Sequence, residues 1–341
     1  MLEIPRLLEE AHARLITRRG HGVEKWQAAP ELEPIARGAY LECDPTWKPW
    51  EKERMVGLAR IQWLTRNEPK AVMALESAAL LHGLPVIGKV DRVHSATGSN
   101  GNHRSTRLAD PRAPEGSRVI VARHAIAIPE TDLIELHGIP TVTPQRIMLD
   151  FARFRPPRES LPITDAALRA LTSATRFRKD LARKRADPIL DELAERLEQT
   201  KGRRGMNRAR AVIHFTNPLS ESPGESALRW VILALGLPHP TAQKHVQVQG
   251  QNFYVDVWIE ELGLGFEFDG LLKYDTETPE GRAAFTKEKR RDDLLASAGV
   301  LAHHVMNEDV TSLEAGRLAL TRCLGADRLR RYTPRKALLG G

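Results

Sequence analysis

Apolar positions along the first part of the chain alternate between helical spacing and short β-rich runs. Over residues 7–15 they recur every three or four positions, which predicts a helix, and residues 35–41 read as a β-element with a turn residue inside it. With a further helix over residues 51–64, this order predicts a winged-helix-like domain over residues 1–65. The β-rich runs and polar loops that follow predict a mixed α/β domain over residues 66–158.

The middle of the chain is predicted to be helical. Thr143-Pro144 opens one helix, because Thr is a favourable N-cap and Pro fits the first helical turn. Helical spacing continues from residue 163 to about residue 214, which predicts a helical bridge over residues 159–216. Turn formers concentrate in residues 217–224 and predict the last domain boundary there.

An acidic hairpin is predicted beyond this boundary, after a helix that carries Glu225 in its first turn. Apolar and polar residues alternate over residues 252–260 and again over residues 264–269, which is typical of two strands with one buried face. Pairing Val257 with Phe268 keeps both apolar rows on the same side. The two strands are therefore expected to form a tight hairpin.

This register gathers carboxylates on the other face of the sheet. It requires a tight turn at Leu262-Gly263, sets Asp256 opposite Asp269 and leaves Glu267 one pair along. Because like charges that face each other destabilise a sheet, we expect a divalent cation, Mg²⁺ or Mn²⁺, at these three carboxylates. A metal that bridges carboxylates and phosphate can activate water for phosphodiester hydrolysis. A solvent-facing acidic hairpin without metal is the alternative that the spacing leaves open.

Basic residues follow the hairpin and also gather in the helical bridge and in a basic tail over residues 328–341. The chain has 51 Lys and Arg against 44 Asp and Glu, a net charge of +7 and a pI near 9.5, which favours polyanionic partners. DNA is the expected partner, because clustered Lys and Arg contact phosphates, although a solvated helix face is the alternative. The candidate DNA contacts are Arg176, Arg178, Lys179, Arg183, Lys184, Arg185, Arg203, Arg204, Arg290 and Arg291.

Other classes of site are disfavoured. The sequence has neither Walker A nor dinucleotide-binding spacing, and no nucleophile elbow. His303-His304 lie on a predicted strand, where adjacent side chains point to opposite faces, so the pair is not expected to chelate one ion. Since the chain has no apolar stretch of roughly 20 residues and no signal core, we expect a cytoplasmic protein without a membrane partner.

Four segments toward the C-terminus occur in an order that resembles a known nuclease family. They are SPGES at 222–226, YVDVWI at 254–259, FEFDG at 266–270 and EKRRDDLLASAG at 288–299. The set resembles bacterial proteins with a very-short-patch-repair-endonuclease-like domain, within the PD-(D/E)xK nuclease superfamily. The resemblance implies an endonuclease-like domain over residues 217–327, in which a mixed, restriction-endonuclease-like β-sheet is flanked by helices and holds a metal.

The resemblance also assigns roles by position. It makes Asp256 the metal-binding Asp, Glu267 the second acid and Glu225 the acid of the first helix. Where the E-x-K form of the motif has its lysine, this chain has Asp269. Either Lys273 or Lys289 takes the role of that lysine, or the role is absent.

The N-terminal half has a second resemblance. The segments IARGAY at 35–40, ESAALLHGLP at 76–85 and IPTVTP at 139–144 look like parts of AbiEi-type antitoxins, over about residues 2–171. Such a region is implied to bind DNA and to repress a toxin operon, with a toxin or other operon-encoded protein as partner. The sequence therefore predicts a DNA-binding, Mg-dependent endodeoxyribonuclease, or alternatively a non-catalytic antitoxin-like repressor with a degenerate nuclease fold.

Overall fold

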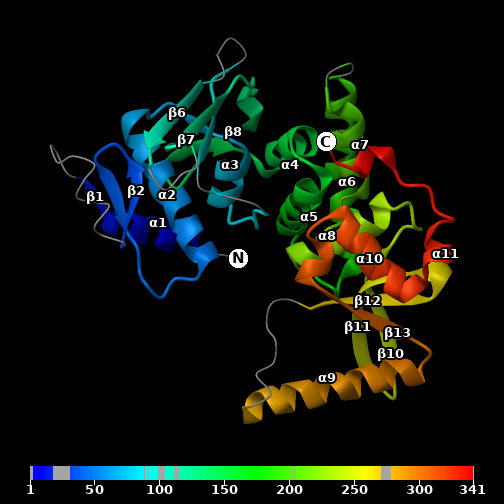
Figure 1. Cartoon of the computed structure of the whole chain (residues 1–341). Helices are drawn as coiled ribbons and strands as arrows, with labels where there is room; N and C mark the ends of the chain where they lie inside the picture. Colours follow the sequence, from blue (N-terminus) through cyan, green and yellow to red (C-terminus); the bar gives the residue numbers. More distant parts are fainter. Residues whose placement is uncertain are drawn as a thin grey trace. The chain divides into compact units, whose positions relative to one another are not determined.

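A computed structural model describes residues 3–17, 31–87, 90, 92–98, 104–110, 115–200, 202, 204–269 and 278–340 (Figure 1). The chain divides into two compact units, Met1–Asp150 and Phe151–Gly341. Each unit combines helices with β-sheets, which confirms the predicted α/β class. Over the described residues, every helix is too short or too polar to cross a membrane.

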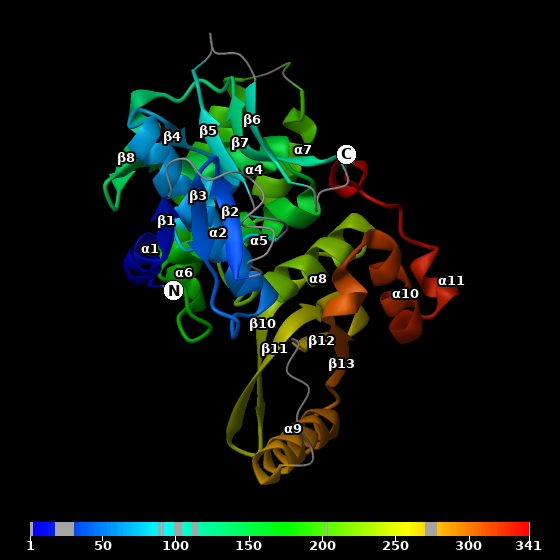
Figure 2. The same ribbon diagram turned by 60° about the vertical axis from the view of Figure 1, so that its left-hand side comes forward.

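The first unit begins with a helix, a three-stranded antiparallel sheet and a second helix (Figure 2). The sheet has the order β1-β3-β2, and the elements are α1 (Ile4–Ala13), β1 (Leu15–Thr17), β2 (Leu32–Ala36), β3 (Ala39–Glu42) and α2 (Pro49–Asn67). The predicted helix over residues 7–15 and the β-element over residues 35–41 are confirmed, apart from small differences at their ends. Arg60 of α2 is fully buried and donates to the carbonyls of Pro34 (2.8 Å) and Ile35 (3.3 Å), which fixes the helix against the sheet.

The rest of the first unit is a four-stranded sheet of order β4-β5-β7-β6, a short helix and a separate hairpin. The elements are β4 (Val72–Met73), α3 (Leu75–Leu81), β5 (Val93–Ala96), β6 (Arg104–Ala109), β7 (Ser117–His124), the 3₁₀ helix η2 (Glu130–Asp132), β8 (Leu133–Leu136) and β9 (Ile139–Val142). One hydrophobic core extends from Ile4 to Ile139. The predicted boundary at residues 65 and 66 lies inside α2, so the segments on either side share that core.

Helices dominate the start of the second unit, as predicted for the bridge. They are α4 (Pro144–Phe154), which spans the division between the units, α5 (Pro157–Thr172), α6 (Lys179–Glu198), α7 (Met206–Phe215) and α8 (Pro223–Ala234). The Thr143 hydroxyl accepts from the Arg146 backbone N–H (3.3 Å), which confirms the predicted N-cap. Asp165 of α5 ties this bundle to α8, because its carboxylate accepts from Arg229 (2.5 Å) and Ser226 (2.8 Å). Residues 217–224 therefore lie within the second unit.

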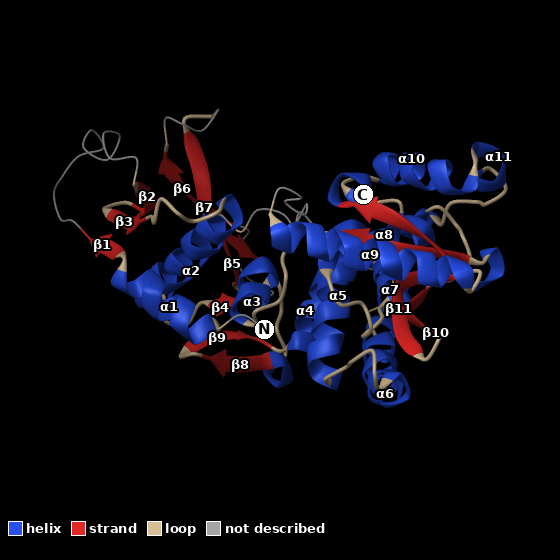
Figure 3. Cartoon of the chain, turned by 90° about the horizontal axis from the view of Figure 1, so that it is seen from below, coloured by secondary structure: helices blue, strands red, loops and turns tan. Residues whose placement is uncertain are grey.

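A four-stranded mixed sheet of order β10-β11-β12-β13 completes the second unit. Figure 2 labels its four strands, and Figure 3 shows β10 and β11 among the strands drawn in red. β10, β11 and β12 are antiparallel, whereas β13 runs parallel to β12 after a crossover through α9. α8 packs against β11 and β12, and α9 contacts β10 and β13. The elements are β10 (Thr241–Val248), β11 (Gln251–Ile259), η3 (Glu260–Leu262), β12 (Leu264–Asp269), α9 (Pro279–Ser297), β13 (Leu301–Met306), η4 (Asn307–Val310), α10 (Leu313–Leu324), α11 (Ala326–Leu329) and η5 (Lys336–Leu338).

The register predicted for the acidic hairpin is wrong by two residues. Val257 pairs with Phe266 and not with Phe268. The cause is the connection, which is a 3₁₀ turn closed by Gly263 at φ 63°, and not the predicted tight turn. A shift of two residues keeps every side chain on its predicted face, because side chains alternate with a period of two.

Candidate functional site

Three of the predicted acids gather where the start of α8 meets the sheet. Extending the observed register by one pair sets Asp256 opposite Glu267, so the predicted pairing of Asp256 with Asp269 is wrong. Glu225 and Glu267 are only 6% and 7% exposed. Burial, together with repulsion from Asp256, raises the pKa of Glu225 and of Glu267 to about 8. Glu225 and Glu267 therefore lack enough nearby positive charge to ionise at their usual pH.

The SPGES segment places Glu225 through its local structure. Ser222 is the N-cap of α8, and its hydroxyl accepts from the Glu225 backbone N–H (3.1 Å). A Cβ atom on Gly224 would lie 2.0 Å from the Phe268 ring, so the helix approaches β12 this closely only with glycine at that position. The Glu225 carboxylate accepts from the Glu221 backbone N–H (2.8 Å) and is held at the edge of the helix facing the sheet.

Gln243 is the site residue that the sequence pattern did not identify. It is fully buried on β10, and its Nε2 donates to Glu225 Oε2 (3.0 Å) and to Asp256 Oδ1 (3.1 Å). Its Oε1 is buried without a hydrogen-bond partner, and its backbone has the left-handed φ of 55°. An unsatisfied buried acceptor and a strained backbone are both unfavourable, and such features persist mainly at functional sites. Nothing in the alternation of β10 distinguishes this Gln from a surface residue.

Arg291 forms an ion pair with one of the three acids. Its guanidinium donates to Glu267 Oε1 (2.6 Å) and to the Tyr254 carbonyl (2.8 Å), so this predicted DNA contact lies at the acidic site. Lys289 is exposed on α9. Lys273, the other candidate for the role of the lysine, lies outside the described residues.

Asp269 belongs to a second cluster. His304 Nδ1 lies 2.8 Å from Asp269 Oδ2 and 3.7 Å from Glu288, and its Nε2 lies 3.2 Å from Asp292. Ligand atoms of Asp269, Glu288 and His304 all lie within 4.8 Å of one another, an arrangement that could hold a metal ion. The hydrogen bond that His304 donates to Asp269 raises the pKa of His304 to about 9, so a charged imidazole balances these acids near neutral pH. Alternation along β13 points His303 and His304 to opposite faces, but His304 alone faces acids from β12 and α9 and needs no second histidine.

Two basic residues of the helical bridge, Arg176 and Lys179, lie next to the acidic site. Lys179 donates to the Gln243 carbonyl, and Arg176 forms an ion pair with Glu221. Both cations lie over the ring of Tyr254, with Arg176 at 5.7 Å and Lys179 at 5.5 Å from its centroid. Arg203 lies outside the described residues. The remaining candidate DNA contacts are exposed: Arg178, Arg183, Lys184, Arg185, Arg204 and Arg290.

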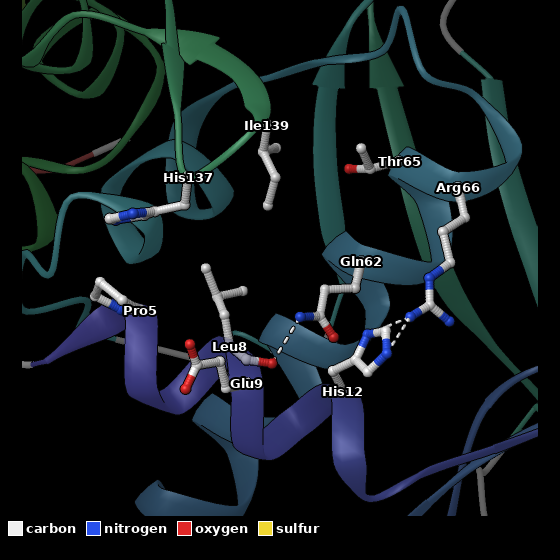
Figure 4. Close-up of a pocket in the computed structure, with 9 residues that line it drawn as sticks. All are labelled: Pro5, Leu8, Glu9, His12, Gln62, Thr65, Arg66, His137 and Ile139. Atoms are coloured by element: carbon white, nitrogen blue, oxygen red, sulfur yellow. Dashed lines mark hydrogen bonds between the residues drawn. The ribbon is translucent and has the colours of Figure 1, made fainter.

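A pocket of about 500 Å³ lies in the first unit, among α1, α2 and the turn between β8 and β9 (Figure 4). Gln62 reaches across it and donates to the Leu8 carbonyl (2.7 Å), and Arg66 lies 3.2 Å from His12 Nε2. His137 lines the opposite side. The residues predicted for catalysis and DNA binding all lie in the second unit, so this pocket is separate from the site that the sequence predicted.

Comparison with known proteins gives two relatives and one solved structure. The uncharacterized proteins MT2308 and Rv2248 of two strains of Mycobacterium tuberculosis are each 28% identical over 179 residues, which is 52% of this chain and 58% of theirs. The match thus spans little more than half the length of these relatives. The crystal structure of the RV2827C protein from Mycobacterium tuberculosis aligns with a TM-score of 0.30 and 16% identity, over 62% of this chain and 80% of that chain. The chain matches no protein-family model.

Proposed function

We propose that the second unit is a metal-dependent endodeoxyribonuclease that binds DNA through the basic residues beside its acids. The observation that supports this most is the cluster of the buried Glu225 and Glu267 with the half-buried Asp256. The amide of Gln243 joins Glu225 to Asp256, and its Oε1 has no partner. Buried like charges are unfavourable unless a cation compensates them, and within the described residues Arg291 pairs with only one of the three acids.

The donor set fits Mg²⁺ or Mn²⁺, which prefer oxygen ligands. Asp256 and Glu267 would hold the ion, with Glu225 and Gln243 Oε1 as further oxygen donors. When bound, such an ion lowers the pKa of water and offsets the negative charge that develops during phosphodiester hydrolysis. Arg291 is too basic to accept a proton, so its contribution would be to bind a phosphate oxygen.

A metal-supplemented cleavage assay on several DNA forms tests the proposal. Asp256→Ala and Glu267→Ala should reduce cleavage to background while DNA affinity stays within about twofold, because the basic contacts remain. Glu225→Ala should cause a smaller loss. Glu261→Ala is the matched control, since this exposed acid lies in the same hairpin, outside the site. Absence of cleavage with every divalent metal, together with no metal-induced thermal stabilisation, would contradict the proposal.

A non-catalytic, antitoxin-like repressor is the second candidate. It is favoured by the amide of Gln243 and the guanidinium of Arg291, which already satisfy part of the acidic set without a metal. In this case Asp256→Ala should raise thermal stability equally with and without metal, because the substitution would only remove repulsion. The DNA-binding residues would then serve to repress an operon. A toxin encoded in that operon would be the protein partner.

A further inference from the structure

Phe177 is an aromatic residue whose exposure the packing of the chain does not explain. It lies in the turn between α5 and α6, and 76% of it is exposed, more than any other exposed large apolar residue among those the structure describes. Its ring meets the ring of Tyr254 edge to face, with centroids 5.6 Å apart and an angle of 85°. The contact fixes Phe177 against β11 while leaving most of its surface open.

Cations surround this aromatic pair. Arg176 and Lys179 lie over the Tyr254 ring, and Arg178 is exposed beside Phe177 in the chain. Tyr254 precedes Asp256 by two positions on β11, so both side chains project from the same face of the sheet. The aromatic pair and the cations over Tyr254 therefore lie on the face of the sheet that carries Asp256, within the second unit.

We infer that Phe177 and Tyr254 form a platform on which an unpaired base of a single DNA strand stacks beside the acidic site. Aromatic rings interleaved with Lys and Arg suit single strands, because the rings contact base faces and the cations contact the phosphates. In a duplex those faces are already covered by neighbouring base pairs. An uncharged protein segment would have to desolvate Arg176 and Lys179 over the Tyr254 ring, whereas a nucleic-acid strand brings phosphates to them. The inference rests on the proposed DNA binding and adds the form of DNA preferred.

Fluorescence anisotropy with the full chain in EDTA tests the platform separately from cleavage. The probes are a labelled oligothymidylate and a labelled duplex of equal length. We expect tighter binding to the single strand than to the duplex. Phe177→Ala should weaken single-strand binding about tenfold, which is the usual effect on affinity of losing one base stacked on an aromatic ring. Duplex binding should change less than about twofold. Phe177→Trp should retain affinity, and its indole fluorescence should be quenched when the oligothymidylate binds.

The control substitution is Leu318→Ala, which removes an apolar side chain that is 60% exposed on α10 in the same unit. It should leave both affinities unchanged. Equal or tighter binding to the duplex, or an unchanged single-strand affinity in Phe177→Ala, would overturn the platform even if metal-dependent cleavage is observed. Conversely, if Asp256→Ala and the wild type both lack cleavage but the Phe177 effect is present, the platform stands and the nuclease proposal fails.

Discussion

At the scale of single residues, Gly224 is needed for its lack of a side chain, not for its backbone freedom. A Cβ atom there would meet three atoms of the Phe268 ring at 2.0 to 2.5 Å. We predict that Gly224→Ala destabilises the second unit by about 1–3 kcal/mol, the usual effect of overpacking, even though Ala favours helices. Thermal denaturation followed by circular dichroism measures the change.

The double variant Gly224→Ala with Phe268→Leu is the control for this explanation. Leu is shorter than the Phe ring, so the second substitution should recover part of the lost stability. If the two effects simply add, the Phe268 ring is not the cause and the close approach of α8 to β12 is wrong.

The buried ion pair between Asp165 and Arg229 is a second feature of single residues on which the stability of the chain depends. Both side chains are at most 1% exposed, and Arg229 also donates to the Phe215 carbonyl (2.7 Å). We predict that Asp165→Ala destabilises the chain by about 3–5 kcal/mol, because it leaves a buried guanidinium without its counter-charge. Chemical denaturation measures the loss. Asp327→Ala, which breaks an exposed ion pair with Arg330, is the control and should have little effect.

At the scale of elements, the acids brought together by α8, β11 and β12 make stability depend on pH. Glu225 and Glu267 have a usual pKa of 4.5 and a pKa of about 8 in the folded chain, so the folded state binds more protons between these values. The free energy of unfolding should therefore fall as pH rises from about 5 to 8, by roughly 3–4 kcal/mol per carboxyl at most. Loss of the charged His304 as pH passes about 9 acts in the same direction.

Glu267→Gln should flatten this dependence, and Mg²⁺ should raise the melting temperature more at pH 8.5 than at pH 5.5, because protons compete with the metal for the same oxygens. Differential scanning fluorimetry across this range measures both effects. A wild-type melting temperature that rises steadily from pH 5 to 8 would contradict the raised pKa values.

Most elements from α4 onward could be predicted because their signals are local. The N-cap at Thr143, the alternation over residues 252–260 and the helix with Glu225 in its first turn depend on neighbouring residues, and the structure contains all three. The register could not be predicted, because two-residue shifts satisfy the same alternation and only the length of the turn decides between them. Asp269 was therefore placed with the wrong partner.

The site was predicted in part for a related reason. Asp256, Glu267 and Glu225 lie on elements with clear patterns, whereas Gln243 and His304 join their clusters only through the pairing of β10 with β11 and of β12 with β13. A buried Gln carries no periodic signal of its own. Contacts between distant parts of the chain, not the pattern of any one segment, bring these residues to the acids.

At the scale of the whole molecule, the division of the chain decides which fragments can fold. Turn formers favour a boundary at residues 217–224, but Asn217 N–H donates to Asp165 (2.7 Å) and Thr216 bonds Thr164 (2.9 Å), so that segment is fastened to α5. Further along, Arg158 donates to the carbonyl of Val310 (3.2 Å), which ties the start of α5 to η4, beyond β13. The helices of the predicted bridge are therefore part of the second unit.

We predict that a fragment of residues 143–341 folds cooperatively by itself, whereas a fragment of residues 217–341 does not. The shorter fragment lacks Asp165, so Arg229, which is fully buried on α8, would have no counter-charge, and α8 would expose the face that packs on α5. Circular dichroism melting and backbone amide exchange of both purified fragments measure the difference. Arg229→Met in the shorter fragment is the decisive comparison, because it removes the unpaired charge but not the exposed apolar face. If the unmodified shorter fragment melts cooperatively near the temperature of the longer one, the predicted boundary at 217–224 is a true domain boundary and the integrated second unit is wrong.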